Sequence, residues 1–402
     1  MLDFDAAQAR LAARAQAPAE HETVTLDALL GRVLAHDLVA NLDLPPADNS
    51  AMDGYALRAA DAAVAGATLP VQQRCFAGQT PDPLRPGQAI RLFTGSLIPA
   101  GADTVVMQEN CQEGDAGVTF ASAVQPGRHI RRQGEDMRHG HVIVRRGTRL
   151  RPGHIAVLAA QGYAQAPVFR HLRVGILTTG DELVAPGQTL PAAAIYNSNA
   201  PMLASLCQGL HTAPAVLRHA RDDAQAIEQA ITELSGTCDL VLSVGGASVG
   251  EKDLVKPAIE SLGGTLDLWR VRMKPGKPVA LADLNDRPIV CLPGNPVSAF
   301  VVFALLVSPL IRGLQGCGQV LPPVRRGILR TDRPLGGDRD DFVRIQAAAQ
   351  DDGLPVLTPH VQQSSGALSS LAWADGLARI PAGTTLQSGA EVGWYGLADW
   401  LG

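Results

Sequence analysis

Lysine is nearly absent from this sequence: four of its 34 basic residues are lysine, and the others are arginine. The net charge is −5, so the chain lacks the positive field that general nucleic-acid binding requires, and we expect no nucleic-acid partner. All four lysines lie between positions 252 and 277. In a chain that otherwise uses arginine, this clustering indicates positions where lysine is specifically required.

Cysteines are also few, and the longest apolar runs are interrupted. The six cysteines include no C-x-x-C pair, which argues against a disulfide framework or a zinc site. The apolar run 299–310 is interrupted by Ser308 and Pro309 and is shorter than the ~20 residues of a membrane helix. Residues 1–16 form a charged amphipathic pattern without the basic and apolar regions of a secretory signal. We therefore expect a cytoplasmic protein that does not enter a membrane.

The patterning of apolar residues changes several times along the chain and predicts a multidomain α/β plus β protein. Apolar spacings of three and four residues predict helix over 1–40, which we group with 140–170 as a helical linker domain. Short alternating runs between Pro/Gly turns predict a β-rich domain over 41–139. Strands alternate with helices over 171–318, which predicts a doubly wound parallel sheet. Short strands and turns over 319–402 indicate a C-terminal β-barrel-like domain.

Two loops of the α/β segment carry groups suited to phosphate, because ligands of open α/β sheets bind at the carboxyl ends of the strands. Asn197 and Ser198 precede a helix expected to begin near Pro201, so either side chain can cap it and leave backbone N–H groups for a phosphate. The loop after the first strand offers hydroxyls, a glycine and adjacent carboxylates, from Thr178, Thr179, Gly180, Asp181 and Glu182.

A glycine-rich strand-to-helix turn follows at 245–253, and its amides could wrap a phosphate. It is not a Walker A loop, since Glu251 follows the last glycine where lysine would be needed. Gly246-x-Ser248-x-Gly250 also matches the nucleophile elbow of serine hydrolases, with His360 as a possible base. A hydrolase therefore stays open as an alternative.

Two further loops favour an anion. In Lys274-Pro275-Gly276-Lys277-Pro278 the prolines keep the chain extended and hold two ammonium groups apart, as a multi-oxygen anion requires. In Pro293-Gly294-Asn295-Pro296, Asn295 is placed as N-cap and Pro296 as the first residue of a helix. Together with Asp181, Glu182, Asp222 and Asp253, which could hold Mg²⁺, these loops indicate nucleotide or phosphoester chemistry.

Taken together and in order, the motifs resemble those of the MoeA family of molybdopterin molybdenumtransferases, which includes the gephyrin E domain. The resemblance covers nearly the whole chain. Its motifs are residues 48–56, 93–95 with Pro99, 134–136, 179–183, 245–253, 274–278 and 292–298.

The resemblance implies that molybdate is inserted into adenylylated molybdopterin, with Mg²⁺-dependent cleavage that releases AMP and molybdenum cofactor. It implies that 171–318 is a MogA-like domain that binds nucleotide and molybdopterin. It further implies a homodimer with the active site between subunits, and a molybdopterin adenylyltransferase as the upstream partner.

The same resemblance assigns residues to roles. AMP and pyrophosphate would be held by Thr178, Gly180, Asn197, Ser198, Gly245, Gly246, Ser248 and Gly250. Asp181 is counted among the cofactor-binding residues. Asp253, with Glu182 and Asp222, would position Mg²⁺. Molybdate would be surrounded by Lys274, Lys277, Ser298, Arg344 and Ser365. The neighbouring loop residues Pro275, Gly276, Pro293, Gly294 and Asn295 would also contribute to cofactor binding. Catalytic positions in the cleft would be Asp53, Thr94 and Asp136, acting from the partner subunit, with Glu182 and Asp253.

A non-catalytic scaffold of the same fold is a third possibility, because gephyrin-like proteins also act as scaffolds. The acids Asp53, Asp136, Glu182 and Asp253 favour the enzyme, since a scaffold has no chemical need of them.

Overall fold

A computed structural model describes residues 2–18, 20–245 and 254–401. The chain divides into two compact units. The large unit contains 1–36, 146–151 and 165–402, and the small unit contains 37–145 and 152–164.

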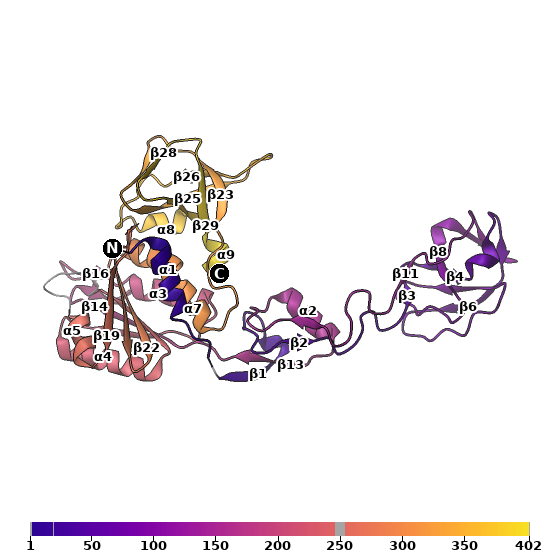
Figure 1. Cartoon of the computed structure of the whole chain (residues 1–402), viewed down its shortest axis with the longest axis horizontal. Coiled ribbons are helices and arrows are strands. Elements are labelled where there is room, and N and C mark those ends of the chain that lie inside the picture. The colour runs from indigo at the N-terminus through magenta and orange to yellow at the C-terminus, as the bar shows by residue number, and fades with distance from the viewer. Residues whose placement is uncertain (1, 19, 246–253, 402) are drawn as a thin grey trace. The chain divides into compact units, whose positions relative to one another are not determined.

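The centre of the large unit is a six-stranded sheet, in which β17, β14, β18 and β22 run parallel and β21 and β19 antiparallel (Figure 1). The doubly wound parallel sheet predicted for this segment is therefore confirmed for four strands, and the two antiparallel strands make the whole sheet mixed. Strand β21 joins β22 through a two-residue hairpin at Asn285 and Asp286, which both have positive φ and match the primed turn that such hairpins prefer. In sheet order the strands are β17 (Val216–Ala220), β14 (Val174–Thr179), β18 (Leu240–Val244), β22 (Arg287–Leu292), β21 (Pro278–Leu284) and β19 (Thr265–Arg270).

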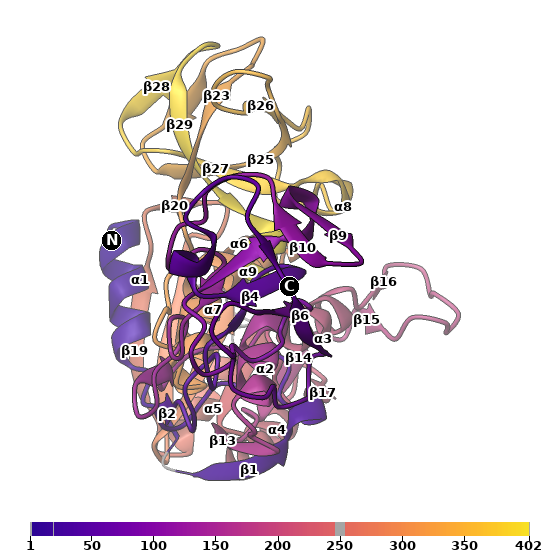
Figure 2. The ribbon, with the colours of Figure 1, turned by 90° about the vertical axis from the view of Figure 1, so that its right-hand side faces the viewer.

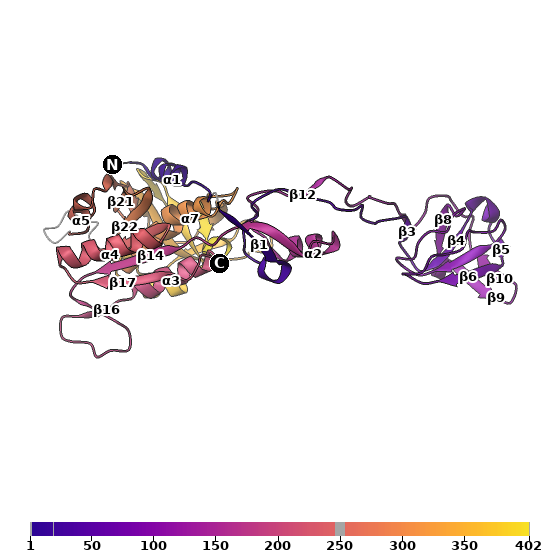
Figure 3. The same ribbon diagram turned by 90° about the horizontal axis from the view of Figure 1, so that it is seen from below.

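Helices cover both faces of this sheet (Figure 3). Side chains alternate along β18: Leu240 and Leu242 face one buried cluster and Val241 the other. The first cluster includes residues of α1 (Phe4–Ala13), α3 (Asn199–Gly209), α6 (Pro296–Val302) and α7 (Ser308–Leu314). The second includes residues of α4 (Ala224–Thr237) and α5 (Val255–Ser261).

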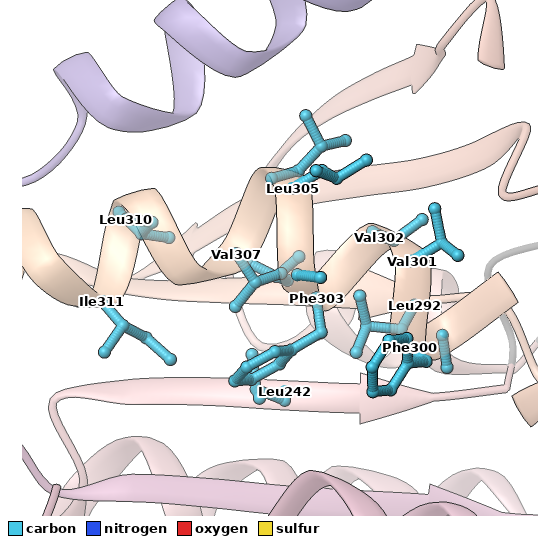
Figure 4. Close-up of a cluster of buried hydrophobic side chains, with 14 of the residues drawn as sticks. Leu242, Leu292, Phe300, Val301, Val302, Phe303, Leu305, Val307, Leu310 and Ile311 are labelled. Carbon is cyan, nitrogen blue, oxygen red and sulfur yellow. The ribbon is translucent and has the colours of Figure 1, made fainter. Parts of the chain in front are cut away.

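The helix that runs over Pro296–Leu314 is long and apolar enough to span a membrane, yet 83% of its apolar window is buried inside the protein (Figure 4). It is a core helix. Its middle turn, Phe303–Val307, is a π-helix just before Pro309. Because proline has no N–H, Pro309 offers no donor to the Leu305 carbonyl, which accepts instead from Nε2 of the buried Gln8, at 2.7 Å.

The N-terminal segment is only partly helical, which corrects the prediction of helix over 1–40. Helix α1 ends at Ala13, and β1 (His21–Thr25) pairs antiparallel with β13 (Gln165–Phe169). A single 3₁₀ turn, η1 (Leu26–Ala28), follows. Threonine and valine in His-Glu-Thr-Val-Thr favour an extended chain, and the partner strand lies 140 residues away.

The C-terminal part closes into a β-barrel, as predicted (Figure 2). Strands β25, β26, β23, β29 and β27 follow one another, and β27 pairs back to β25. The short β20 (Met273–Lys274), from the α/β segment, adds to β25 in parallel. The barrel strands are β23 (Arg325–Leu329), β25 (Asp340–Ala348), β26 (Val356–Pro359), β27 (Gly376–Ile380) and β29 (Glu391–Gly396).

The small unit is rich in strands, as the alternating runs predict. One sheet has the order β6, β7, β4, β8 and another the order β5, β10, β9. It also holds the helix α2 (Pro152–Ala160). The strands of the first sheet are β6 (Val71–Cys75), β7 (Ala89–Leu92), β4 (Gly54–Leu57) and β8 (Thr104–Met107), and those of the second are β5 (Thr68–Leu69), β10 (Gly117–Phe120) and β9 (Cys111–Gly114).

Candidate functional site

The loops predicted to hold phosphate meet at the carboxyl edge of the sheet. Asn197 Nδ2 donates to Thr178 Oγ1 at 2.9 Å, and its Oδ1 accepts from the backbone N–H of Ala200 at 3.1 Å. The Asn197 side chain thus holds an N–H in the first turn of α3, as expected of a cap. Helix α3 begins at Asn199, two residues before the predicted start, and Ser198 is its N-cap residue.

Asn199 is a site residue that the sequence analysis missed. Its side chain is 8% exposed, and Nδ2 donates to the Gly294 carbonyl at 2.7 Å, which ties the loop before α3 to the loop before α6. Its Oδ1 is buried and has no hydrogen-bond partner within the described part of the chain. Asn199 belongs to the same Asn-Ser-Asn triplet as Asn197, but its role depends on a contact 95 residues away.

Gly245 ends β18 at a close approach between two of these loops. Its φ is +98°, and a Cβ there would lie 2.9 Å from Thr179 Oγ1, so a side chain is excluded. Its N–H donates to the Leu292 carbonyl at 3.3 Å. The predicted residues Gly246, Ser248, Gly250 and Asp253 lie outside the described residues.

Two of the predicted acids are neighbours at the same edge. The backbone N–H of Asp222 donates to Asp181 Oδ1 at 3.4 Å, because β14 and β17 are adjacent parallel strands. Glu182 follows directly, and its carboxyl lies against Gly180, whose φ is +141°. Among the described residues, no three His, Cys, Asp or Glu side chains form a group that could hold a metal ion. Asp253 lies outside the described residues, so this finding does not include it.

A pocket of about 590 Å³ joins the lysine loop, the start of α6 and a loop of the barrel. It brings together 274–278, 293–295, Ser298 and Ser365, and Gly245 lies at its wall. Asn295 is the N-cap residue of α6 with Pro296 next, as predicted. Asn295 Nδ2 also donates to Ser365 Oγ at 3.3 Å, across the boundary between the sheet domain and the barrel.

The two lysines of the pocket differ in charge environment. Lys274 Nζ lies 3.0 Å from Oδ2 of Asp341, a buried carboxylate of β25. Lys277 has no ion-pair partner among the described residues, so its charge is left to meet an anion. Gly276 between them has a φ of +106°, and a Cβ there would lie 2.5 Å from Val302. Arg339, which the sequence analysis missed, also lines the pocket and donates to the Met273 carbonyl at 3.2 Å.

Arg344 lies behind this pocket rather than in its lining. The side chain is fully buried, and burial lowers the pKa of its guanidinium. Nη2 donates to the carbonyls of Ser364 and Gln362 at 3.0 and 3.3 Å, and Nε donates to Ser370 Oγ at 3.1 Å. Arg344 therefore supports the loop that carries Ser365.

The remaining predicted residues belong to the small unit. Asp53 Oδ1 accepts from the backbone N–H of Thr94 at 2.7 Å and from its hydroxyl at 2.8 Å. These two hydrogen bonds lower the pKa of Asp53, so the group is a carboxylate near neutral pH. Asp136 lies in the loop after β11 (Ile130–Arg131), where its N–H donates to the Leu44 carbonyl.

Three family models match successive parts of the chain: the MoeA N-terminal region (domain I and II) over 2–162, a probable molybdopterin binding domain over 175–313, and the MoeA C-terminal region (domain IV) over 326–397. The chain is 38% identical over 347 residues to a molybdopterin molybdenumtransferase of Haemophilus influenzae, covering 86% of this chain and 85% of the relative. It is 35% identical over 381 residues to one of Nostoc sp., covering 92% and 87%. A crystal structure of the molybdopterin biosynthesis moeA protein from Pyrococcus horikoshii OT3 matches with a TM-score of 0.83 and 29% identity, over 98% of this chain and all of that one.

Proposed function

This chain belongs to the MoeA family, and on that premise we propose that it inserts molybdate into adenylylated molybdopterin and releases AMP. The activity is that of a molybdopterin molybdenumtransferase in molybdenum cofactor biosynthesis. The observation that carries the finer proposal is the pocket in which the lysine loop, the start of α6 and the barrel loop meet.

Molybdate, a tetrahedral dianion, binds in this pocket. Lys277 supplies a cation without a competing partner among the described residues, while Lys274 is held by Asp341. Ser298 and Ser365 offer hydroxyls, and the first turn of α6 offers backbone N–H groups. This mixture of charged and neutral donors suits an oxyanion that must be bound and then released. Arg344 acts through the loop it supports.

The adenylate binds along the neighbouring sheet edge. Thr178, Asn197 and Ser198 surround the first turn of α3, and Gly245 lets the backbone approach the phosphates. Asn199 fixes the position of this edge relative to the molybdate pocket through its hydrogen bond to the Gly294 carbonyl. The product AMP leaves from here once water attacks the pyrophosphate link, which forms a new P–O bond, breaks the anhydride bond and gives AMP and the phosphate of molybdopterin. Gly246, Ser248 and Gly250 complete this subsite in the proposal.

We propose that Mg²⁺ is held at the same edge, because it takes oxygen ligands and usually needs only one or two carboxylates beside phosphate oxygens. Glu182, Asp222 and Asp253 would hold it, next to Asp181. When bound, the ion would neutralise charge on the pyrophosphate.

We further propose that the protein is a cytoplasmic homodimer. Asp53, Thr94 and Asp136 of the partner subunit complete the site, and a molybdopterin adenylyltransferase supplies the adenylylated substrate. The hydrogen bond from the Thr94 N–H lowers the pKa of Asp53 and fixes the orientation of its carboxylate.

AMP release from adenylylated molybdopterin with Mg²⁺, with and without molybdate, tests this function. We expect AMP and active cofactor to appear together when molybdate is added. Binding of the adenylate without turnover in either condition would instead favour the scaffold. Labelling of Ser248 by a fluorophosphonate would favour the hydrolase.

A further inference from the structure

A second pocket, of about 370 Å³, lies in the C-terminal barrel. Strands β23 and β26 are parallel neighbours, with Leu329 opposite Leu357, so both end at the same edge of the barrel. The loop after β23 contributes Arg330 and Arg333, and the segment after β26 contributes His360. Basic side chains from two separate loops therefore meet in one pocket.

In the described part of the chain, the two arginines of this pocket lack the ion pairs that neighbouring arginines make. Within the described ranges, the guanidinium groups of Arg330 and Arg333 make no ion pair and no hydrogen bond. Two arginines on β23 itself are engaged: Arg325 with Asp399 at 2.5 Å, and Arg326 with Glu391 at 3.2 Å. One carboxylate, Asp332, also lines the pocket, and two guanidinium groups outweigh it.

The loops around the pocket are fixed by their own hydrogen bonds. The Thr331 hydroxyl donates to the Arg333 carbonyl at 2.8 Å and accepts from the Arg333 N–H at 3.4 Å. His360 Nδ1 lies 3.0 Å from the backbone N and O of Gln362, which leaves Nε2 as the ring nitrogen that can meet a ligand. The His360 ring packs edge-on against Trp373, with centroids 4.9 Å apart.

Gln363 connects this pocket to the molybdate pocket, because it lines both. Its Nε2 donates to the carbonyls of Arg344 and His360, at 2.9 and 3.0 Å, and its Oε1 accepts from the Arg344 N–H at 3.1 Å. A side chain held by three hydrogen bonds is therefore shared by the linings of the two pockets.

We propose that the pocket of Arg330, Arg333 and His360 is a second binding site for a small tetrahedral oxyanion, separate from the site of Lys277. Guanidinium groups bind such anions through paired charged hydrogen bonds. The site is inferred from the barrel alone, and its occupation by molybdate rests on the proposed function. Phosphate has the same shape and donor requirements, so the test distinguishes the two anions.

Equilibrium dialysis of the full-length protein against molybdate, at constant ionic strength, counts the sites. We expect two molybdates per wild-type chain. The variant R330Q/R333Q should keep the Lys277 site and bind the other molybdate at least about tenfold more weakly, because it loses charged hydrogen bonds. The variant K277A should keep the barrel site and lose affinity for the molybdate of the Lys277 site.

The matched control is R325Q/R326Q, which removes the same charge from the same barrel at paired arginines. It should bind two molybdates. A single site in the wild type, or equal losses in R325Q/R326Q and R330Q/R333Q, would overturn the proposal. Thermal melting of each variant confirms that the barrel is folded.

Tryptophan fluorescence gives a second readout, because Trp373 touches His360. Molybdate or phosphate should change the emission in the wild type and in K277A, but not in W373F or R330Q/R333Q. A response to phosphate as strong as that to molybdate would assign the site to oxyanions in general, and a response to molybdate alone would assign it to the substrate. An equal response to chloride would contradict a built site. These readouts do not use turnover, so a failed AMP assay would leave them standing.

Discussion

The side-chain amide of Asn199 donates a 2.7 Å hydrogen bond to the carbonyl of Gly294, and so joins the loop that opens α3 to the loop that opens α6. One loop belongs to the proposed adenylate subsite and the other to the molybdate pocket. In the proposed reaction one substrate, adenylylated molybdopterin, has to reach both subsites, so their relative position matters more than the strength of one hydrogen bond.

Asn199→Ala should therefore impair activity more than stability. The net loss of one hydrogen bond is about 0.5–1.5 kcal/mol in the free energy of unfolding. Turnover should fall by about tenfold or more, because reacting groups lose alignment. Urea unfolding and AMP release measure the two effects. Ser205→Ala, on the same helix, removes a hydroxyl bonded to Pro201 and serves as the control. Wild-type kinetics in Asn199→Ala would contradict the role.

The lysine pair makes a second prediction. Lys274→Ala should weaken molybdate use more than AMP binding, because removing one cation from a dianion site costs about 1.5–3 kcal/mol. It also leaves Asp341 unpaired beside the pocket. The double variant Lys274→Ala/Asp341→Asn should therefore recover part of the molybdate dependence. Molybdate titration of AMP release measures the molybdate dependence, and calorimetric binding of AMP measures the AMP affinity. Equal losses of molybdate and AMP affinity would refute the assignment.

The lowered pKa of Asp239 predicts how the stability of the protein depends on pH. Burial opposes its ionisation, but hydrogen bonds from Arg170, at 2.7 Å, and from the backbone N–H of Arg173 outweigh burial and lower the pKa of Asp239. The folded state therefore binds this proton less readily than the unfolded chain. The stabilisation is fully present above the unfolded pKa of about 4 and is lost as pH falls below it toward the lowered value.

Asp239→Asn should cost about 3 kcal/mol at pH 7 and flatten the acid limb of the stability curve. Urea unfolding between pH 3 and 7 measures the free energy of unfolding, at pH values that bracket the unfolded pKa of about 4. Glu233→Gln breaks an exposed pair with Arg218 and should change stability little. An acid limb unchanged in Asp239→Asn would show that other carboxylates set it.

Subunit mixing tests whether Asp53 acts in trans. Asp53→Asn and Lys277→Ala should each be inactive as homodimers. If the partner subunit's Asp53 completes each site, mixed dimers contain one intact site, and random mixing should restore about a quarter of wild-type activity. Activity that stays at background in verified mixed dimers would place Asp53 in the site of its own chain.

The sequence was sufficient to predict much of the site, because parallel strands bring their following loops to one edge whatever the chain does in between. Thr178 and Asn197 meet there, and Asn295 occupies the N-cap position of α6, as its place before proline predicts. Gly276 of the lysine loop is required by its φ of +106°, and a Cβ there would also lie 2.5 Å from Val302.

Contacts over long sequence distances could not be predicted in the same way. Strand β1 depends on β13, far along the chain, and its apolar spacing alone suggested helix. Strand β21 begins at Pro278, the last residue of the loop predicted to be extended, and no strand was predicted over 279–284. Its hairpin to β22 makes the sheet mixed. Arg339 reaches the pocket from the barrel, and no local pattern around it indicates an anion.

The most direct test of the central claim is to locate molybdate in crystals of this protein by anomalous scattering at the molybdenum edge. We predict a peak in the pocket between the lysine loop, α6 and the barrel, within hydrogen-bond reach of Lys277 and Ser298. A peak in the Lys277→Ala crystal equal to that of the wild type, or no peak in this pocket at saturating molybdate, would contradict it.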